Sequence, residues 1–415
     1  MSIIKAFKGL RPVQEKAALV ASPPYDVLSS AEARQVAEGN RFCFLRVVKP
    51  EIDLEPGIDP YSDAVYAKGA QNLRALEETG VMLRDSAPCL YLYEQQMQIG
   101  DRNHVQMGLV AGVSVDEYQG GLIKKHELTR ADKEKDRTRH IEATRANTGP
   151  VFLTYRSAPR INALAEENSR IEPTYDFVAN DGIRHRFWVV SDDEKIAALV
   201  SAFSKVPCLY IADGHHRAAS ASNVRELCKK AGGGQPIGDA YNYFLAVMFP
   251  HDQMYIMDYN RVVLDLNNLS ESDFLARIEA HFELSKTDSP RPQRAKEFGM
   301  YLGRSWYRLR ARAGSYNPSD PVESLDVAIL QNCLLSPVLG ISDPRIDKRI
   351  DFVGGIRGLG ELERRVKQGA AVAFAMYATS IEQVLAIADA GKIMPPKSTW
   401  FEPKLRSGMV VRFLD

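Results

Sequence analysis

The side chains best suited to chemistry gather in the stretch IADGHHRAAS, residues 211–220. Four ionisable residues surround one glycine, in the order Asp213, Gly214, His215, His216 and Arg217. An apolar run precedes them and small residues follow, so a strand, a sharp turn and a helix start are predicted. A helix start offers free N–H groups and a positive dipole end, and an arginine can bind two phosphate oxygens. The stretch is therefore suited to an oxyanion, above all a phosphate.

The same residues also fit a plain helix start, with Asp213 as the cap and two surface histidines. Adjacent histidines point in different directions on a helix, which argues against a zinc site. Asp213 would not bind phosphate, but its carboxylate could hold Mg²⁺ or orient a histidine. The residues alone leave both interpretations open.

A second group of charged residues lies between apolar segments, in the tract 121–152. Residues 125–147 are too charged for a core, and we expect one or two exposed helices there. A solvated helix face is the usual meaning of such a run. Here both signs of charge occur together, which suits an anionic ligand associated with a metal. The residues concerned are His126, Glu127, Arg130, Asp136, Arg137, His140, Glu142 and Arg145.

Two loops that contain proline complete the candidate sites. PPYDV, residues 23–27, is a rigid turn from which Asp26 could hold a metal or a substrate amine, although a structural corner explains it equally well. A loop near the other end is rich in hydrogen-bond donors that suit a carboxylate or a phosphate, although an ordinary turn would look the same. Its residues are Lys397, Ser398 and Thr399.

The elements that must position these residues indicate an α+β fold with mixed sheets (α/β mixed), not a doubly wound one, because hairpins are prominent. We expect a hairpin from strands 89–98 and 105–115, joined by GDRN, and a second from 241–249 and 255–263. Helices are expected over 30–38, 60–79, 192–203 and from the corner to residue 231, with Ser29 or Ser30 as the first N-cap.

The length of 415 residues exceeds what one compact core usually holds. We expect three regions. An N-terminal α/β region would cover 1–120 and a catalytic core 121–265. A C-terminal α/β region, 266–415, would contribute the loop with Lys397.

Composition limits the class of protein. Lys+Arg and Asp+Glu both number 53, and this zero net charge makes a broad nucleic-acid surface an unfavoured interpretation. Five scattered cysteines without C-x-x-C indicate reduced thiols. We find no apolar run long enough for a signal peptide or a membrane span, so we expect a cytoplasmic protein with no membrane partner. The P-loop, G-x-G-x-x-G and G-x-S-x-G motifs are absent.

Three motifs, in order along the chain, resemble those of the free-serine kinases of the ParB/sulfiredoxin superfamily. They are His126-Glu127 within KKHELTR, DGHHR over 213–217, and PKST over 396–399. The whole chain also resembles a long ParB-like family formerly of unknown function, through PPYDV, KHELTR, ADGHHR and MPPKSTWFEPKL. Some members of that family are serine kinases that use pyrophosphate. The first hundred or so residues match only this long family.

The resemblance implies a ParB/sulfiredoxin-like core and a kinase that converts free L-serine to O-phosphoserine. The donor would be pyrophosphate or an adenine nucleotide, ATP or ADP, with Mg²⁺ as cofactor. A homodimer is among the expected assemblies, although the sequence does not determine the oligomeric state.

The resemblance also implies roles for the site residues. Glu127 would be the base that takes the hydroxyl proton, with His216 and the metal-binding Asp213 as further catalytic residues. It implies donor binding for Gly214, His215 and Arg217, and substrate binding for His126, Lys397, Ser398 and Thr399. The charges of Arg130 and Arg137 add these two residues to the expected donor site, and Asp26 is a further candidate for the substrate amine.

Two other functions stay open. A ParB-like module could bind DNA or a nucleotide, although no clear helix-turn-helix follows DGHHR. The same site could also serve a phosphoserine phosphatase, because sequence does not fix the direction of transfer.

Overall fold

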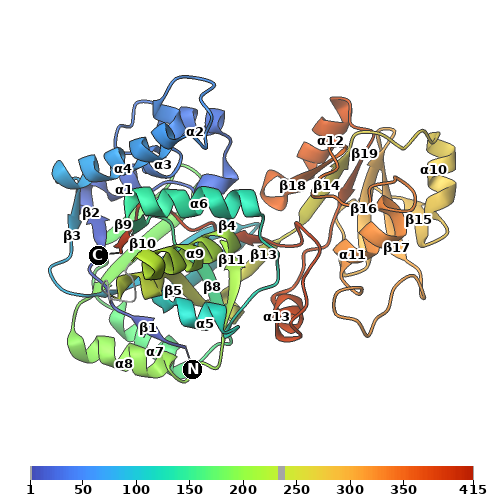
Figure 1. Cartoon of the computed structure of the whole chain (residues 1–415). Coiled ribbons are helices and arrows are strands. Elements are labelled where there is room, and N and C mark those ends of the chain that lie inside the picture. The colour runs from blue at the N-terminus through green and yellow to red at the C-terminus, as the bar shows by residue number, and fades with distance from the viewer. Residues whose placement is uncertain (1, 232–238, 415) are drawn as a thin grey trace. The chain divides into compact units, whose positions relative to one another are not determined.

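The computed structural model describes residues 2–231 and 239–414, and these form two compact units (Figure 1). Unit 1 comprises Met1–Met254 with Pro403–Asp415, and unit 2 comprises Tyr255–Glu402. These limits differ from the expected regions 1–120, 121–265 and 266–415. Strands on both sides of residue 120 pair in one sheet, and the last residues of the chain return to unit 1. No helix in the described ranges is both long and apolar enough to span a membrane.

The main sheet of unit 1 has the strand order β6-β11-β8-β12-β5-β4-β10-β9, with β1 also paired to β5. The pairs β6–β11 and β8–β12 are parallel and the other pairs are antiparallel, so the sheet is mixed. Its strands are β1 (Ile4–Lys5), β4 (Leu90–Ile99), β5 (Arg102–Ser114), β6 (Ile123–Lys124), β8 (Val151–Tyr155), β9 (Tyr175–Val178), β10 (Arg184–Val190), β11 (Leu209–Asp213) and β12 (Tyr243–Pro250).

Helices cover this sheet and complete its core. On one side α6 lies along α9, and α4 and α5 pack against this pair, while α7 and α8 pack together (Figure 1). Apolar side chains of the strands meet Ala218 of α9, Leu164 of α7 and Phe203 of α8 in one buried cluster. These helices are α4 (Asp63–Glu78), α5 (Val115–Gln119), α6 (Ala131–Thr144), α7 (Pro159–Asn168), α8 (Asp193–Phe203) and α9 (His215–Ala231).

A second apolar cluster lies under the N-terminal helices and includes Phe44, Leu73 and, just before the last strand, Val411. Ser29 forms a capping box with Glu32, which confirms Ser29 as the N-cap of α2. The C-terminal strand pairs with β7, and β2 pairs with β3. The elements of this part are β2 (Leu10–Pro12), α1 (Ala17–Val20), α2 (Ser30–Ala37), α3 (Leu45–Val48), β3 (Met82–Arg84), β7 (Ala146–Asn147) and β21 (Arg412–Phe413).

Unit 2 is built on an antiparallel sheet of order β15-β17-β16-β19-β14-β18, and β13 pairs separately with β20. Its strands are β13 (Tyr255–Met257), β14 (Tyr259–Val263), β15 (Phe282–Lys286), β16 (Glu297–Leu302), β17 (Ser305–Ala311), β18 (Ile350–Gly354), β19 (Val372–Ala375) and β20 (Trp400–Glu402). Its helices are α10 (Glu271–Ile278), α11 (Asp326–Leu330), α12 (Leu359–Lys367) and α13 (Ile381–Asp389), and α11 continues as one π-helical turn, Gln331–Leu335.

The expected α+β fold with mixed sheets is confirmed. The hairpin of β4 and β5 is also as predicted. The second predicted hairpin is wrong, because β12 pairs with β5 and β8 in unit 1 while β14 pairs with β18 and β19 in unit 2. Every residue of β12 from Phe244 to Pro250 is buried, so a central position in the large sheet suits this strand better than a hairpin with solvent on one face.

Candidate functional site

The strand, turn and helix predicted for residues 211–220 are present. Strand β11 is buried up to Ala212, and its pairing with β8 shifts register between Ile211 and Asp213. Helix α9 begins at His215, and the N–H of Ala218 donates to the carbonyl of Gly214. Small residues follow on α9, and Ser220 Oγ donates to the carbonyl of Glu134 on α6. The corner is therefore fixed by the sheet behind it and by α6 beside it.

Gly214 is required at this corner for two reasons. Its φ of +92° is one that side chains rarely adopt, and a Cβ would lie 2.9 Å from Arg217 Nε. The Arg217 guanidinium thus lies directly over the turn, and its Nη1 donates to the carbonyl of Pro150. Its Nε is buried and has no hydrogen-bond partner in the described part of the chain. This leaves one strong donor of the corner available for a ligand.

Charges from distant parts of unit 1 surround the corner. Lys404 Nζ lies 2.9 Å from Asp213 Oδ2, and Arg217 Nη2 lies 3.7 Å from Asp213 Oδ1 and 3.9 Å from Asp26 Oδ2. Burial by itself would raise the pKa of Asp213, but Lys404 and Arg217 outweigh it and hold this pKa below its ordinary value. Burial also acts to lower the pKa of Arg217, and Asp26 and Asp213 reverse that effect. Asp213 is thus an ionised partner of two cations.

His126 and Glu127 reach the same corner because β6 and β11 are parallel neighbours. Parallel strands end at the same edge of a sheet, so the residues after β6 lie beside the residues after β11. The rings of His126 and His215 meet edge to face, with centroids 4.6 Å apart. Glu127 Oε2 lies 3.9 Å from His215 Nδ1, and the Glu127 side chain is 41% exposed. The structure therefore brings the HE and DGHHR motifs together.

The histidines of the corner lie in a setting that favours the neutral imidazole. Burial lowers the pKa of His126 to about 4, with the charge of Asp213 opposing it in part. Burial, helped by His126, also holds the pKa of His215 well below its ordinary value. His216 Nε2 accepts a hydrogen bond of 3.1 Å from the N–H of Arg130, and burial lowers its pKa as well.

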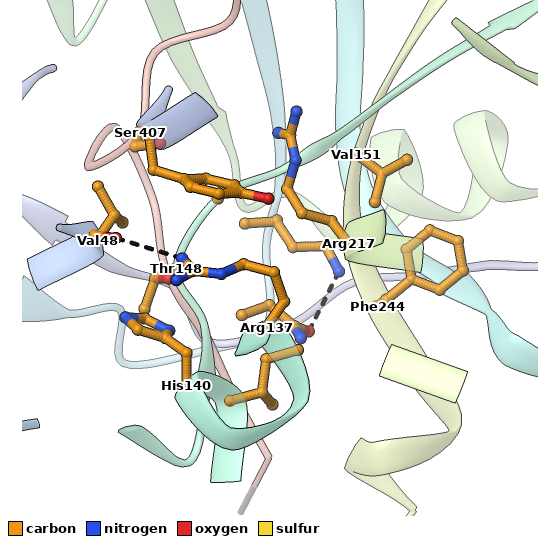
Figure 2. Close-up of a pocket in the computed structure, with 13 residues that line it drawn as sticks. Val48, Arg137, His140, Thr148, Val151, Arg217, Phe244 and Ser407 are labelled. Carbon is orange, nitrogen blue, oxygen red and sulfur yellow. Dashed lines mark hydrogen bonds between the residues drawn. The ribbon is translucent and has the colours of Figure 1, made fainter. Parts of the chain in front are cut away.

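A small pocket opens beside Arg217, and its cavity volume of about 30 Å³ is enough for about one water molecule. Figure 2 shows Arg217 and Arg137 reaching it from different helices, with Val151 and Phe244 on the wall near Arg217. Arg137 is held by its neighbour Asp136 and by the carbonyl of Val48. The residues that line the pocket are Tyr25, Val48, Arg137, His140, Ile141, Asn147, Thr148, Gly149, Val151, Arg217, Phe244, Leu245 and Ser407.

Helix α6 is less exposed than the charged tract suggested. Asp136 and His140 are both buried. The hydroxyl of Tyr66 donates to Asp136 at 2.9 Å, and His140 Nε2 lies 2.9 Å from the carbonyl of Val47. The expectation of exposed helices over 125–147 is therefore wrong for one face of α6, where partners from α4 and α3 satisfy the polar groups. Arg130, by contrast, is exposed and pairs with Asp132.

The loop of Lys397, Ser398 and Thr399 belongs to unit 2, and so does not share the compact unit of the corner. Lys397 is exposed and adopts a φ of +58°. Ser398 is buried, and its carbonyl accepts a hydrogen bond of 2.9 Å from Thr379 Oγ1. Arg261 donates to the carbonyl of Lys397 at 3.0 Å. These contacts explain the shape of the loop.

Lys404 was not among the predicted site residues. It lies within MPPKSTWFEPKL, but nothing in the local pattern connects it with Asp213, 191 positions earlier. Pro403 to Asp415 rejoin unit 1, and only this return places a lysine against the corner. A lysine that follows a proline in a marked motif is the one signal that could have pointed to it.

The fold and the site define a mixed α+β protein in which Arg217 and Lys404 face Asp213 and Asp26 at a helix start next to a glutamate. The chain belongs to the family described as protein of unknown function (DUF1015), whose pattern matches residues 4–328. No curated protein matches the sequence.

Several solved structures are similar to parts of this chain. One is a free serine kinase in complex with AMP, with 13% identity, a TM-score of 0.37, and coverage of 70% of this chain and 86% of that one. A conserved hypothetical protein from Pyrococcus furiosus has 14% identity, a TM-score of 0.35, and coverage of 72% and 93%. SbnI with a C-terminal truncation from Staphylococcus aureus has 12% identity, a TM-score of 0.37, and coverage of 71% of this chain and 82% of that one. Likenesses of this degree carry no argument about activity.

Proposed function

We propose that this protein is a phosphotransferase that moves a phosphoryl group to the hydroxyl of free L-serine, forming O-phosphoserine. The donor is pyrophosphate or an adenine nucleotide, and unit 1 contains the ParB/sulfiredoxin-like core. One observation carries the proposal: the corner of residues 213–217 holds Arg217, whose buried Nε has no hydrogen-bond partner among the described residues, and the carboxylate of Glu127 lies 3.9 Å from His215 in that corner. The ordered motifs HE, DGHHR and PKST support the same reaction.

The donor phosphate would bind at the start of α9. The free N–H groups of the first helical turn and the Arg217 guanidinium are donors suited to phosphate oxygens. Phosphoryl transfer depends mainly on positioning and on charge neutralisation, which a fixed arginine and a helix start supply. The pocket beside Arg217 offers arginines on one side and apolar side chains on another.

Glu127 would accept the proton of the serine hydroxyl. A general base must be within hydrogen-bond reach of this proton, and a partly exposed carboxylate at the edge of the corner can meet an incoming amino acid. Asp26, also at the corner, is suited to the substrate amine. Binding of the substrate carboxylate by Lys397, Ser398 and Thr399 stays a prediction from the motif.

Mg²⁺ is proposed to enter as part of the donor, bound to its phosphate oxygens, where it would neutralise their charge. Asp213 does not fit the role of its protein ligand. Its carboxylate already lies 2.9 Å from Lys404 and 3.7 Å from Arg217. A third cation on the same carboxylate would be repelled by these two.

The test is to incubate the purified protein with L-serine and Mg²⁺ and, in separate reactions, pyrophosphate, ATP or ADP. O-phosphoserine is then measured by mass spectrometry, with reactions that lack Mg²⁺ and reactions with L-alanine as controls. The proposal expects O-phosphoserine with at least one donor. No product with any of the three would overturn it.

A further inference from the structure

Three residues of unit 1 place metal-ligand atoms close together next to the corner. His126 and Glu127 follow β6, and His215 begins α9. One ligand atom from each lies within 4.8 Å of the other two. The two imidazole rings are edge to face, an arrangement in which their nitrogens can converge on one point instead of stacking.

The two histidines are buried in a way that hydrogen bonding does not explain. His126 is 2% exposed and His215 is 6% exposed. Among the described residues, neither ring nitrogen of His126 nor Nε2 of His215 makes a hydrogen bond of normal geometry, although the backbone of Ile211 is near enough to His126 to act against the lowering of its pKa. Buried polar atoms nearly always have a partner, and an absent ligand is one reason for an exception.

We infer that His126, Glu127 and His215 bind a divalent transition-metal ion of the Zn²⁺ or Mn²⁺ kind. Two imidazole nitrogens and one carboxylate suit such ions, whereas Mg²⁺ prefers a shell of oxygens. Three protein ligands leave the coordination sphere incomplete, as in catalytic metal sites. The cation of this corner is therefore held by the histidines and Glu127 rather than by Asp213, which is paired with Lys404.

The metal-binding inference stands apart from the kinase, but its use in catalysis rests on the proposed function. The open position of the ion lies beside the corner where the donor phosphate is proposed to bind. Glu127 has two carboxylate oxygens. Coordination through Oε2, the atom 3.9 Å from His215 Nδ1, leaves Oε1 to accept the serine proton. The same residue can then serve both purposes.

The experiment uses the full chain, stripped of metal with a chelator and dialysed against Zn²⁺, Mn²⁺ or Mg²⁺ without serine or donor. Metal content is measured by mass spectrometry and affinity by calorimetry. We expect about one Zn²⁺ or Mn²⁺ per chain and much weaker Mg²⁺ binding. His126→Gln and His215→Gln should each weaken Zn²⁺ binding by at least about 100-fold. His281→Gln, in unit 2, is the matched control and should bind as the parent does. Unchanged Zn²⁺ binding in both variants, or equal affinity for Mg²⁺, would overturn the inference.

A second readout avoids the risk that a variant fails to fold. Co²⁺ in the parent protein should give visible absorption of nitrogen and oxygen ligands, and Zn²⁺ should raise the unfolding temperature. Absorption from thiolate ligands would place the metal elsewhere, and the absence of a Co²⁺ spectrum would exclude it.

Different results would reject the metal proposal and the kinase proposal. Metal binding without O-phosphoserine would reject the kinase, and O-phosphoserine formed by metal-stripped protein with Mg²⁺ alone would reject the metal's use in catalysis.

Discussion

Two segments rich in aspartate and arginine use their charges differently. In residues 343–349 of unit 2, Asp343 pairs with Arg345 at 2.7 Å, and Asp347 pairs with Arg349 at 2.8 Å. In the corner of residues 213–217, Asp213 pairs with Lys404, 191 positions away. The first segment pairs its charges mainly within itself, although Arg349 also lies 3.4 Å from Asp265. The corner has charges that only the folded chain brings together.

This difference helps to tell a candidate functional site from a charged surface segment. The side-chain hydrogen bond from Arg345 lowers the pKa of Asp343 to about 2, although this pair is exposed. A shifted pKa therefore does not by itself identify a site. The corner differs because, within the described residues, Arg217 Nε and His215 Nε2 are buried without a hydrogen-bond partner. Unused binding capacity, rather than charge density, distinguishes the two segments.

The largest effect should come from removing the proposed base. Glu127→Gln keeps the size of the side chain but removes its basicity, and we expect turnover of L-serine to fall by about 100-fold or more. Asp343→Asn, in the segment with local pairs, should leave turnover unchanged. Initial rates of O-phosphoserine formation test both. Similar rates in the two variants would remove the functional distinction between the segments.

Buried histidines should make unit 1 sensitive to acid. Burial, together with the charge of Arg137, lowers the pKa of His140 from 6.5 to about 3. Between these values the unfolded chain binds a proton that the folded chain does not, so this stability is complete above pH 6.5 and is lost as the pH falls. The loss from His140 should reach about 3 kcal/mol at pH 4, at ~1.4 kcal/mol per pKa unit.

Urea unfolding of the parent and of His140→Gln, from pH 7 to pH 4, measures how much His140 contributes to this loss of stability. The glutamine can still donate to the carbonyl of Val47, but it does not titrate. The variant should therefore show a shallower loss of stability with falling pH. If the free energy of unfolding fell equally with pH in the two proteins, His140 would not be a cause of the acid sensitivity.

Breaking the distant ion pair should cost more than breaking a local one. Lys404→Met leaves the charge of Asp213 without its nearest partner in a largely buried place, and we expect the free energy of unfolding to fall by about 2 kcal/mol. Arg345→Met removes an exposed partner, and no measurable change is expected. Urea unfolding compares the two. Adding Asp213→Asn to Lys404→Met should recover part of the loss, because the unpaired charge is then gone.

The smallest effect is expected at the turn glycine. Gly214→Ala forces an unfavourable φ and a contact with Arg217, so stability should fall by about 1 to 2 kcal/mol and activity should fall as well. Gly358 is a matched control, because it precedes α12 with a φ of +69° but a Cβ there would meet nothing. Gly358→Ala should cost stability only. Equal activity in the two variants would show that Arg217 does not need the space over Gly214.

Local patterns predicted the local parts of this molecule. The apolar run, Gly214 and the small residues of α9 are neighbours in sequence, so the strand, turn and helix could be recognised. The hairpin of β4 and β5 was recognisable from its turn. Long-range pairing could not be predicted in this way, and the assignment of β12 to a hairpin failed because its partners β5 and β8 are far along the chain.

The candidate site likewise has features that the local sequence predicts and features that depend on the whole fold. DGHHR was found from its residues, and the motif resemblance put Glu127 beside it. The reason for that closeness, the parallel pairing of β6 with β11, has no local signal. Lys404 was missed since the return of the last residues to unit 1 is a property of the whole fold. The burial of His126 has no signal in a tract whose charges are typical of a solvated face, and the burial of His215 has none at a helix start that could equally carry surface histidines.

The most direct test of the central claim is a calorimetric titration of pyrophosphate into the parent protein, Arg217→Gln and Arg345→Gln. If the corner is the phosphate site, the parent binds pyrophosphate, Arg345→Gln binds it equally well, and Arg217→Gln binds it at least about 10-fold more weakly, as expected for loss of a charge-assisted contact. Equal affinity in the parent and Arg217→Gln, or no binding by the parent, would contradict the account.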